Sequence, residues 1–237
     1  ALHRYESDDM SAAVIQLKNA LQQDSKMLAA HLLLGKALLK SGDLQSAQVA
    51  FEEALKQGVS RAEVAIPLGR VYLALGHPEA LIDRILPSGL TPDLQVEVLT
   101  MRGNAYLEME KNNLAIQSFD SARAINPQSI SLLVAEIPML LTAGKISQAR
   151  EKSAKAMSLA PSNAYVWNAK ASVAHAAFEF PEALAAYDKA LTLYPNYIDA
   201  RLARAALLID MKREAEAQKD LEYLRAVAED DPRAAYL

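Results

Sequence analysis

The 237-residue sequence predicts an all-α fold, an α-solenoid of antiparallel helix pairs in about seven repeats of 34 residues. The first observation is a column of mostly small residues that recurs every 34 positions: Ala13, Ala47, Leu81, Ala115, Ala149, Ala183 and Ala217. The second is a mostly bulky column at the same spacing: Leu17, Phe51, Ile85, Phe119, Ser153, Tyr187 and Leu221. The third is the composition, because 51% of the residues are hydrophobic and the glycines and prolines fall largely between the periodic segments.

An array of this kind is expected to be one quasi-linear domain over 1–237, in which each repeat contacts only its neighbours. The columns place a partial repeat at 1–27, followed by repeats at 28–61, 62–95, 96–129, 130–163, 164–197 and 198–231. Residues 232–237 predict the start of a further helix. Because Ala1 falls in the middle of a repeat, we expect the chain to be a segment of a longer array.

Each repeat is expected to hold two amphipathic helices, A and B, joined by a short turn. The predicted helices are 10–23, 27–40, 43–57, 61–75, 78–86, 92–109, 111–125, 128–143, 145–159, 162–177, 179–193, 196–211 and 213–229. Gly42, Gly76 and Gly144 stand where a helix A ends, and glycine readily adopts the left-handed conformation that terminates a helix.

The third repeat, 62–95, departs most from the pattern. Leu81 stands in the small-residue column, and the segment 86–92 contains two prolines and a glycine that shorten the second helix and form a loop. Pro67 and Pro138 fall inside predicted A helices, where each removes an amide donor and crowds the carbonyl four residues earlier. We therefore expect kinks at these two positions.

Several repeats resemble the tetratricopeptide (TPR) signature, in which small and aromatic positions of helix A are followed by A-x3-F-x2-A and a proline. The repeat at 96–129 carries it as Gly103, Tyr106, Ala115, Phe119, Ala122 and Pro127. The resemblance covers the whole chain. It implies a right-handed superhelix whose A helices line a concave groove for protein or peptide partners.

By this resemblance, the usual ligand contacts carry over to positions on helix A. The candidate partner-binding residues are Tyr5, Lys36, Leu39, Lys40, Arg70, Leu73, Asn104, Leu107, Glu108, Tyr165, Asn168, Ser172 and His175. Lys36, Lys40 and Arg70 predict a basic patch for an extended peptide or an anionic chain end. The alternative is an ordinary solvated helix face. A chaperone-type carboxylate clamp is disfavoured, because only Asn104 fits its requirements.

A closer resemblance lies in residues 12–47. This stretch contains polar residues that we expect to face solvent and that helix packing does not demand: Gln16, Lys18, Asn19, Gln22 and Gln23. It resembles the TPR-repeat lipoproteins of bacterial PEP-CTERM/exosortase systems, which accompany exopolysaccharide biosynthesis in Gram-negative bacteria. The resemblance implies a periplasmic scaffold, tethered to the membrane by an upstream lipid anchor, that supports exopolysaccharide export or exosortase-linked protein sorting.

Charge and composition exclude several kinds of partner and site. The 25 Lys and Arg residues against 29 Asp and Glu residues give a formal charge of −4, which argues against a nucleic-acid-binding surface. The sequence has no cysteine, so it contains no disulfide, thiolate metal site or cysteine nucleophile. It also lacks an apolar run of about 18 residues, so we expect no transmembrane segment in this sequence.

No motif predicts catalysis. His3, His31, His77 and His175 fall in different repeats, so no pair has the three- or four-residue spacing of a helical metal site. His31 shares a column with Trp167 and is expected to pack against its neighbours. The sequence contains no phosphate-cradling, dinucleotide-binding or nucleophile-elbow motif. We therefore expect a non-enzymatic protein with no metal and no cofactor.

Two alternatives to the periplasmic scaffold remain open. One is a cytoplasmic TPR adaptor that binds peptide termini. The other is the recognition arm of a larger enzyme, such as a glycosyltransferase, whose catalytic domain lies outside this sequence.

Overall fold

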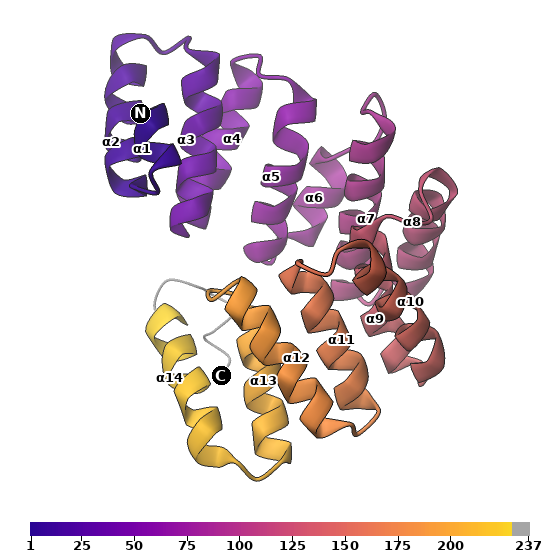
Figure 1. Cartoon of the computed structure of the whole chain (residues 1–237). Coiled ribbons are helices and arrows are strands. Elements are labelled where there is room, and N and C mark those ends of the chain that lie inside the picture. Colours follow the sequence, from indigo (N-terminus) through magenta and orange to yellow (C-terminus); the bar gives the residue numbers. More distant parts are fainter. Residues whose placement is uncertain (229–237) are drawn as a thin grey trace. The chain divides into compact units, whose positions relative to one another are not determined.

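The computed structural model describes residues 1–228, which form fourteen α-helices and no strand (Figure 1). The helices are α1 (Leu2–Glu6), α2 (Met10–Gln23), α3 (Leu28–Ser41), α4 (Leu44–Lys56), α5 (Arg61–Ala74), α6 (Pro78–Arg84), α7 (Pro92–Glu108), α8 (Asn112–Ile125), α9 (Ile130–Thr142), α10 (Ile146–Leu159), α11 (Ala164–Ala176), α12 (Phe180–Leu193), α13 (Ile198–Asp210) and α14 (Glu214–Ala228). None of the helices in this described part combines the length and the apolar character that crossing a membrane requires.

The predicted helices are confirmed, with ends that differ from the expected ones by at most two residues. The additional helix is α1, which lies in the partial repeat and was not predicted as a helix of its own. Pro67 lies inside α5 and Pro138 inside α9, as expected. The further helix predicted at 232–237 lies outside the described residues.

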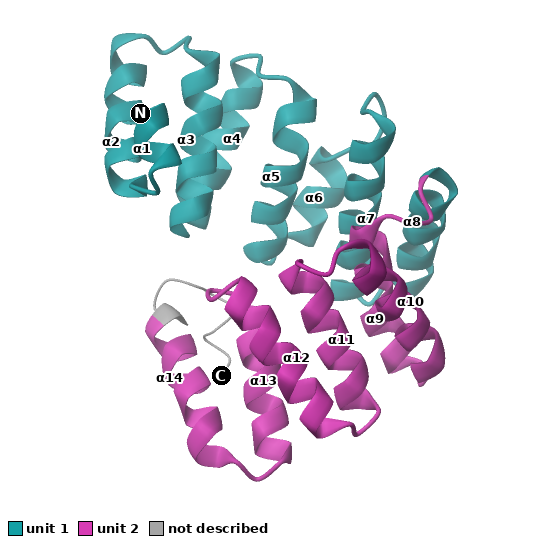
Figure 2. Cartoon of the chain, in the orientation of Figure 1, with its two compact units in different colours: residues 1–125 teal, residues 126–237 magenta. Residues whose placement is uncertain are grey.

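The chain divides into two compact units, residues 1–125 with α1–α8 and the part from Asn126 onward with α9–α14 (Figure 2). In both units, each helix A packs against the following helix B, as in the pairs α3 with α4, α7 with α8, and α11 with α12. Successive A helices also contact one another, for example α3 with α5 and α9 with α11. One continuous array over 1–237 remains a prediction.

The columns of the sequence are the packing contacts between paired helices. Ala47, Phe51 and Ala54 on α4 are fully buried. The ring of Phe51 lies against Gly35 on α3, so closely that a Cβ atom added to this glycine would stand 2.6 Å from the ring. Gly103 on α7 faces the buried ring of Phe119 in the same way. The small residues therefore let an aromatic ring of helix B reach the backbone of helix A.

Residues in the neighbouring columns also pack as expected. His31 is buried, and its Nε2 lies 2.8 Å from the carbonyl oxygen of Ser25. Trp167 is partly buried against the core of the second unit, and its indole N–H donates to the carbonyl oxygen of Pro161 at 2.7 Å. Tyr187 is 1% exposed. These side chains belong to the core, although the hydroxyl of Tyr187 has a further contact described below.

The short helix α6 ends where the sequence predicts a loop, and an arginine of the next helix satisfies its last carbonyls. Nη1 of Arg102 on α7 donates to the carbonyl oxygens of Ile82 at 2.5 Å and Ile85 at 3.3 Å. Carbonyls at the end of a helix have no partner within that helix. Arg102 therefore ties the shortened helix to the following repeat.

The turn from helix A to helix B has one backbone conformation throughout the described chain. Positions 34 residues apart all have positive φ: Asp8, Gly42, Gly76, Glu110, Gly144, Phe178 and Lys212. In all but the second of these turns, the next amide donates to a carbonyl five residues earlier, as Glu179 does to Ala174 at 2.9 Å. This is a Schellman motif, which ends helix A. Phe178 is unusual here, because a bulky residue rarely adopts positive φ.

Replacing Gly103 by leucine should lower the free energy of unfolding by roughly 1–3 kcal/mol, because the new side chain has to displace the ring of Phe119. Ala115→Leu, at a fully buried position on α8, should have a similar effect. Urea denaturation followed by circular dichroism measures both. Gln117→Leu, exposed on α8, is the control and should change stability by less than about 0.5 kcal/mol. An unchanged stability of both buried variants would contradict the helix pairing.

Phe178→Gly should raise the free energy of unfolding by about 1 kcal/mol, because glycine adopts the left-handed conformation without the Cβ clash of phenylalanine. The loss of the ring should cost little, since Phe178 is 80% exposed. Gly144→Ala, in the equivalent turn of the preceding repeat, should lower the same quantity by about 1 kcal/mol. A lower stability of Phe178→Gly would mean that the packing of the ring outweighs the backbone strain.

Candidate interaction site

The candidate residues predicted from the sequence lie on A helices, and none of them is buried. In the first unit they lie on α1 (Tyr5), α3 (Lys36, Leu39 and Lys40), α5 (Arg70 and Leu73) and α7 (Asn104, Leu107 and Glu108). In the second unit they all lie on α11: Tyr165, Asn168, Ser172 and His175.

In the first unit, the three predicted cations differ in their surroundings. Nζ of Lys40 lies 2.8 Å from a carboxylate oxygen of Asp8 and 5.4 Å from the centre of the Tyr5 ring. The hydrogen bond with Asp8 raises the pKa of Lys40, against a smaller effect of desolvation. Lys36 and Arg70 stand at equivalent positions of α3 and α5 and make no ion pair with the described residues. The positive charge of this face therefore comes mainly from Lys36 and Arg70.

In the second unit, Tyr165 and Asn168 belong to a cluster of tyrosines. The ring of Tyr165 lies 4.8 Å from that of Tyr197 and 6.3 Å from that of Tyr194, measured between ring centres. Asn168 donates from Nδ2 to the hydroxyl oxygen of Tyr197 at 3.3 Å. Burial raises the pKa of Tyr197, so this hydroxyl stays protonated. The cluster joins α11 to the turn between α12 and α13 and is part of the packing between repeats.

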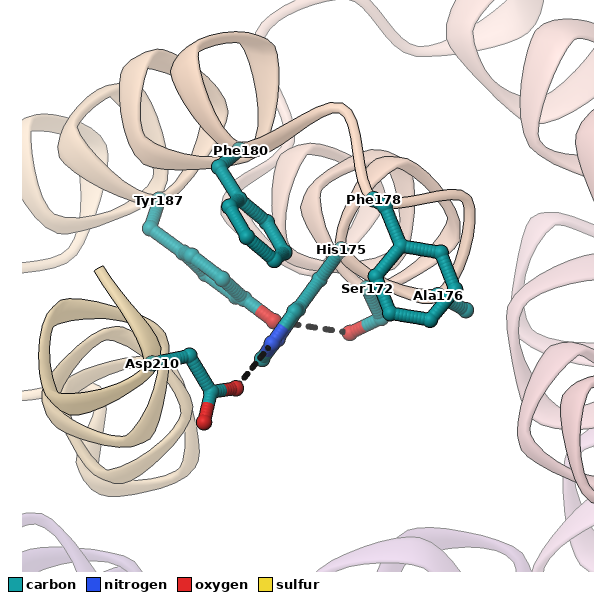
Figure 3. A pocket seen from close by; sticks show the side chains of 7 residues that line it. All are labelled: Ser172, His175, Ala176, Phe178, Phe180, Tyr187 and Asp210. Atoms are coloured by element: carbon teal, nitrogen blue, oxygen red, sulfur yellow. Dashed lines mark hydrogen bonds and ion pairs between the residues drawn. The ribbon is translucent and has the colours of Figure 1, made fainter.

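Ser172 and His175 belong to a different feature of the same unit, a pocket of about 650 Å³. Its lining comes from α11, α12, α13 and the turn between α11 and α12, and consists of Ser172, His175, Ala176, Phe178, Phe180, Tyr187 and Asp210 (Figure 3). We call this feature the aromatic pocket.

The polar groups at the base of the aromatic pocket are neutral. The hydroxyl of Tyr187 lies 3.3 Å from Oγ of Ser172, which itself donates to the carbonyl oxygen of Asn168 at 3.0 Å. Burial raises the pKa of Tyr187, and the hydrogen bond with Ser172 opposes this effect. Tyr187 therefore remains protonated at neutral pH and donates its hydroxyl hydrogen to Ser172.

The rim of the aromatic pocket combines one carboxylate with aromatic rings. Nε2 of His175 donates to a carboxylate oxygen of Asp210 at 2.8 Å, and Figure 3 shows the imidazole pointing from α11 toward α13. The side chain of Asp210 is 55% exposed. The ring of Phe180 lies edge-on to His175 at 5.9 Å and to Phe178 at 6.0 Å. The rim is thus open to solvent and carries one acidic group.

Sequence reasoning identified two residues of this pocket as contacts, Ser172 and His175, and missed the others. It assigned Tyr187 to the core, which is confirmed, because this residue is 1% exposed; its hydroxyl also reaches the pocket lining. Phe178 and Phe180 were not singled out; Phe178 lies in the turn between helices, and Phe180 is the first residue of α12. A signal was present for Phe178, since it stands in the column that holds Gly42, Gly76 and Gly144.

Three family models described as tetratricopeptide repeat match the sequence, at residues 4–66, 96–129 and 134–198. Together these matches cover more than half of the chain. They agree with the positions of the helix pairs in both units. Among curated proteins, no sequence matches this chain.

Solved structures of the same fold include a tetratricopeptide repeat protein from Parabacteroides merdae, with a TM-score of 0.65 and 18% identity over 94% of this chain and 88% of that one. A thermophilic TPR protein from Thermus thermophilus has a TM-score of 0.59 and 23% identity over 77% of this chain and 99% of that one.

A chain of the APC/C hetero-tetramer Cut9-Hcn1 has a TM-score of 0.68 and 14% identity, and the match covers 98% of this chain but 46% of that chain. These identities are low, so the likenesses concern the fold alone. The fold, the period of 34 residues and the three matching family models lead to the same conclusion. The chain belongs to the tetratricopeptide repeat family.

Proposed function

We propose that this chain is a non-enzymatic scaffold that binds protein or peptide segments on the exposed faces of its A helices. The observation that carries the proposal is the separation of two sets of residues on the same helices. The residues of the two repeating columns are buried except Leu221, which is partly exposed, whereas every candidate contact residue keeps part of its surface in water. Lys36 and Arg70 take no part in this packing and are available to a partner, whereas Leu39 and Leu73 also pack partly against the core. Tyr165 and Asn168 belong to the tyrosine cluster between repeats.

For the first unit, we propose a partner segment with acidic side chains or a terminal carboxylate. Lys36 and Arg70 supply positive charge at equivalent positions of neighbouring A helices, and partly exposed leucines at 39, 73 and 107 supply apolar contact. Lys40 contributes less, because Asp8 already pairs with it. Electrostatic attraction of this kind mainly accelerates encounter and sets orientation.

The double substitution Lys36→Glu and Arg70→Glu should raise the Kd for such a segment roughly tenfold or more, because two attractive charges become repulsive. The probes are peptides selected from a random library on the immobilised chain, and calorimetry measures their affinity. Lys40 is left unchanged, since Glu at this position would face Asp8.

The control for this experiment is Lys26→Glu together with Lys111→Glu, which changes the net charge equally at exposed positions outside the proposed contact face. Thermal unfolding of both double variants should match that of the original chain. If the control weakens binding as much as the test variant, net charge rather than the A-helix face governs affinity. Unchanged affinity of the test variant would favour an ordinary solvated face.

We further propose that the full-length protein acts in the periplasm, tethered by a lipid anchor, in exopolysaccharide export or exosortase-linked sorting. The support is the resemblance of residues 12–47 to lipoproteins of PEP-CTERM/exosortase systems. The residues that set this stretch apart are all exposed in the first unit, so packing has not imposed them: Gln16, Lys18, Asn19, Gln22 and Gln23.

Cell fractionation of the native organism tests this assignment, together with mass spectrometry of the amino-terminal peptide of the mature protein. A lipid-modified cysteine and recovery with the membrane fraction are expected. Recovery in the cytosol would instead favour the cytoplasmic adaptor, and a catalytic domain in the same polypeptide would favour the recognition arm of an enzyme.

A further inference from the structure

We propose that the aromatic pocket of the second unit binds the guanidinium group of an arginine side chain in a peptide partner. This inference rests on the proposed function and names the chemistry of one of its contacts. It follows from three observations. The pocket has an acidic group that pairs with no described lysine or arginine. It has the exposed ring of Phe178 beside the partly buried ring of Phe180. Elsewhere in the described chain, cations of its own lie between an aromatic ring and a carboxylate.

The acidic group is Asp210. One of its carboxylate oxygens accepts from His175, and more than half of the side chain remains in solvent. Arg213 does not balance its charge, because Nε and Nη2 of Arg213 pair with both carboxylate oxygens of Glu216 at 2.6 and 2.7 Å. Lys212 makes no ion pair with any residue in 1–228. The pocket therefore has an acidic rim above a neutral base.

The aromatic rings are Phe178 and Phe180. Phe178 is 80% exposed, so its ring face is open to a ligand. Its backbone has a φ of +61°, at a turn position where three other repeats have glycine and three have Asp8, Glu110 or Lys212. A bulky residue in this conformation is strained, and such strain is concentrated at functional sites. The face of an aromatic ring attracts cations, and a planar guanidinium can stack on it while donating to a carboxylate.

The described part of the chain contains three examples of a cation held between an aromatic ring and a carboxylate. Arg201 places its guanidinium carbon 3.7 Å from the centre of the Tyr223 ring and donates to Asp220 at 3.1 Å. Lys40 lies over Tyr5 beside Asp8, and Lys170 lies over Trp167 and 3.0 Å from Glu182. The lining of the aromatic pocket likewise contains a carboxylate and phenylalanine rings, with His175 between Asp210 and Phe178 in Figure 3, and it contains no lysine or arginine.

The test uses the whole chain labelled with ¹⁵N and Nα-acetyl-L-arginine amide as the probe. Titration followed by amide chemical shifts should perturb residues 172–180 and 210, with a Kd in the millimolar range, roughly what one charged contact provides. The citrulline analogue has the same shape without the charge and should bind at least about tenfold more weakly. The lysine analogue should also bind more weakly. Its ammonium group is not planar, so it cannot stack on a ring or donate two parallel hydrogen bonds to one carboxylate as a guanidinium group does.

Two variants assign the contacts. Asp210→Asn should weaken arginine binding roughly tenfold, since the charge-assisted hydrogen bond is lost. Phe178→Gly should weaken it roughly two- to fivefold through the loss of the cation–π contact, although the variant is expected to be the more stable protein. Weaker binding by a stabilised protein cannot be explained by unfolding. Asp199→Asn, on the same helix α13 but outside the pocket lining, is the control and should bind as the original chain does.

Equal shifts with arginine and citrulline would overturn the proposal, and so would unchanged binding by Asp210→Asn. Lysine binding as tightly as arginine would overturn the guanidinium assignment. These outcomes are distinct from failure of the proposed function, which depends on peptides selected on the immobilised chain and on their loss of affinity for the Lys36→Glu and Arg70→Glu variant. If the pocket binds the arginine probe but the library yields no binding peptide, the pocket proposal is supported and the scaffold proposal is contradicted.

Discussion

The contact between a glycine or alanine of helix A and an aromatic ring of helix B determines how close the paired helices lie. Gly35 with Phe51 and Gly103 with Phe119 are the clearest cases, because even one added methyl group would overlap the ring. In the second unit, Ala171 and Tyr187 belong to one buried cluster. Since interiors are close-packed, a fixed distance between helices also fixes which side chains of helix A remain outside. The exposed faces proposed for partner binding therefore depend on this buried contact.

The turn between the paired helices shows that one backbone conformation can be held with very different side chains. Asp8, Glu110, Phe178 and Lys212 adopt the left-handed conformation that glycine adopts in the equivalent turns. The packing of the two helices on either side compensates for the strain of these residues. The backbone conformation at this position is thus constrained. The identity of the side chain is not, because the side chain is exposed to solvent. In the turn between α11 and α12 this side chain is Phe178, whose aromatic ring lies at the rim of the aromatic pocket.

Charged groups in this chain are often placed beside aromatic rings. At Tyr5, Trp167 and Tyr223, a cation lies over the aromatic ring and also pairs with a carboxylate. These contacts join neighbouring helices. These pairs are mostly near the surface, where each contributes modestly to stability. Asp220 is an exception, because it is 1% exposed and pairs with both Arg201 and Arg204. The net charge of the chain is therefore a poor guide to where free charge is presented to a partner.

The sequence by itself determined the fold of this protein, since a period of 34 residues in small and bulky columns is visible without coordinates and corresponds to buried contacts along the chain. It also separated Ala47 and Phe51, which are buried, from Lys36 and Arg70, which are not. The tertiary structure alone decided which exposed residues meet. Asp8 neutralises Lys40 from another repeat, and Asp210 on α13 reaches His175 on α11. Such pairings depend on the rotation of each helix about its axis and on side-chain rotamers. A repeating pattern of buried residues predicts neither of them.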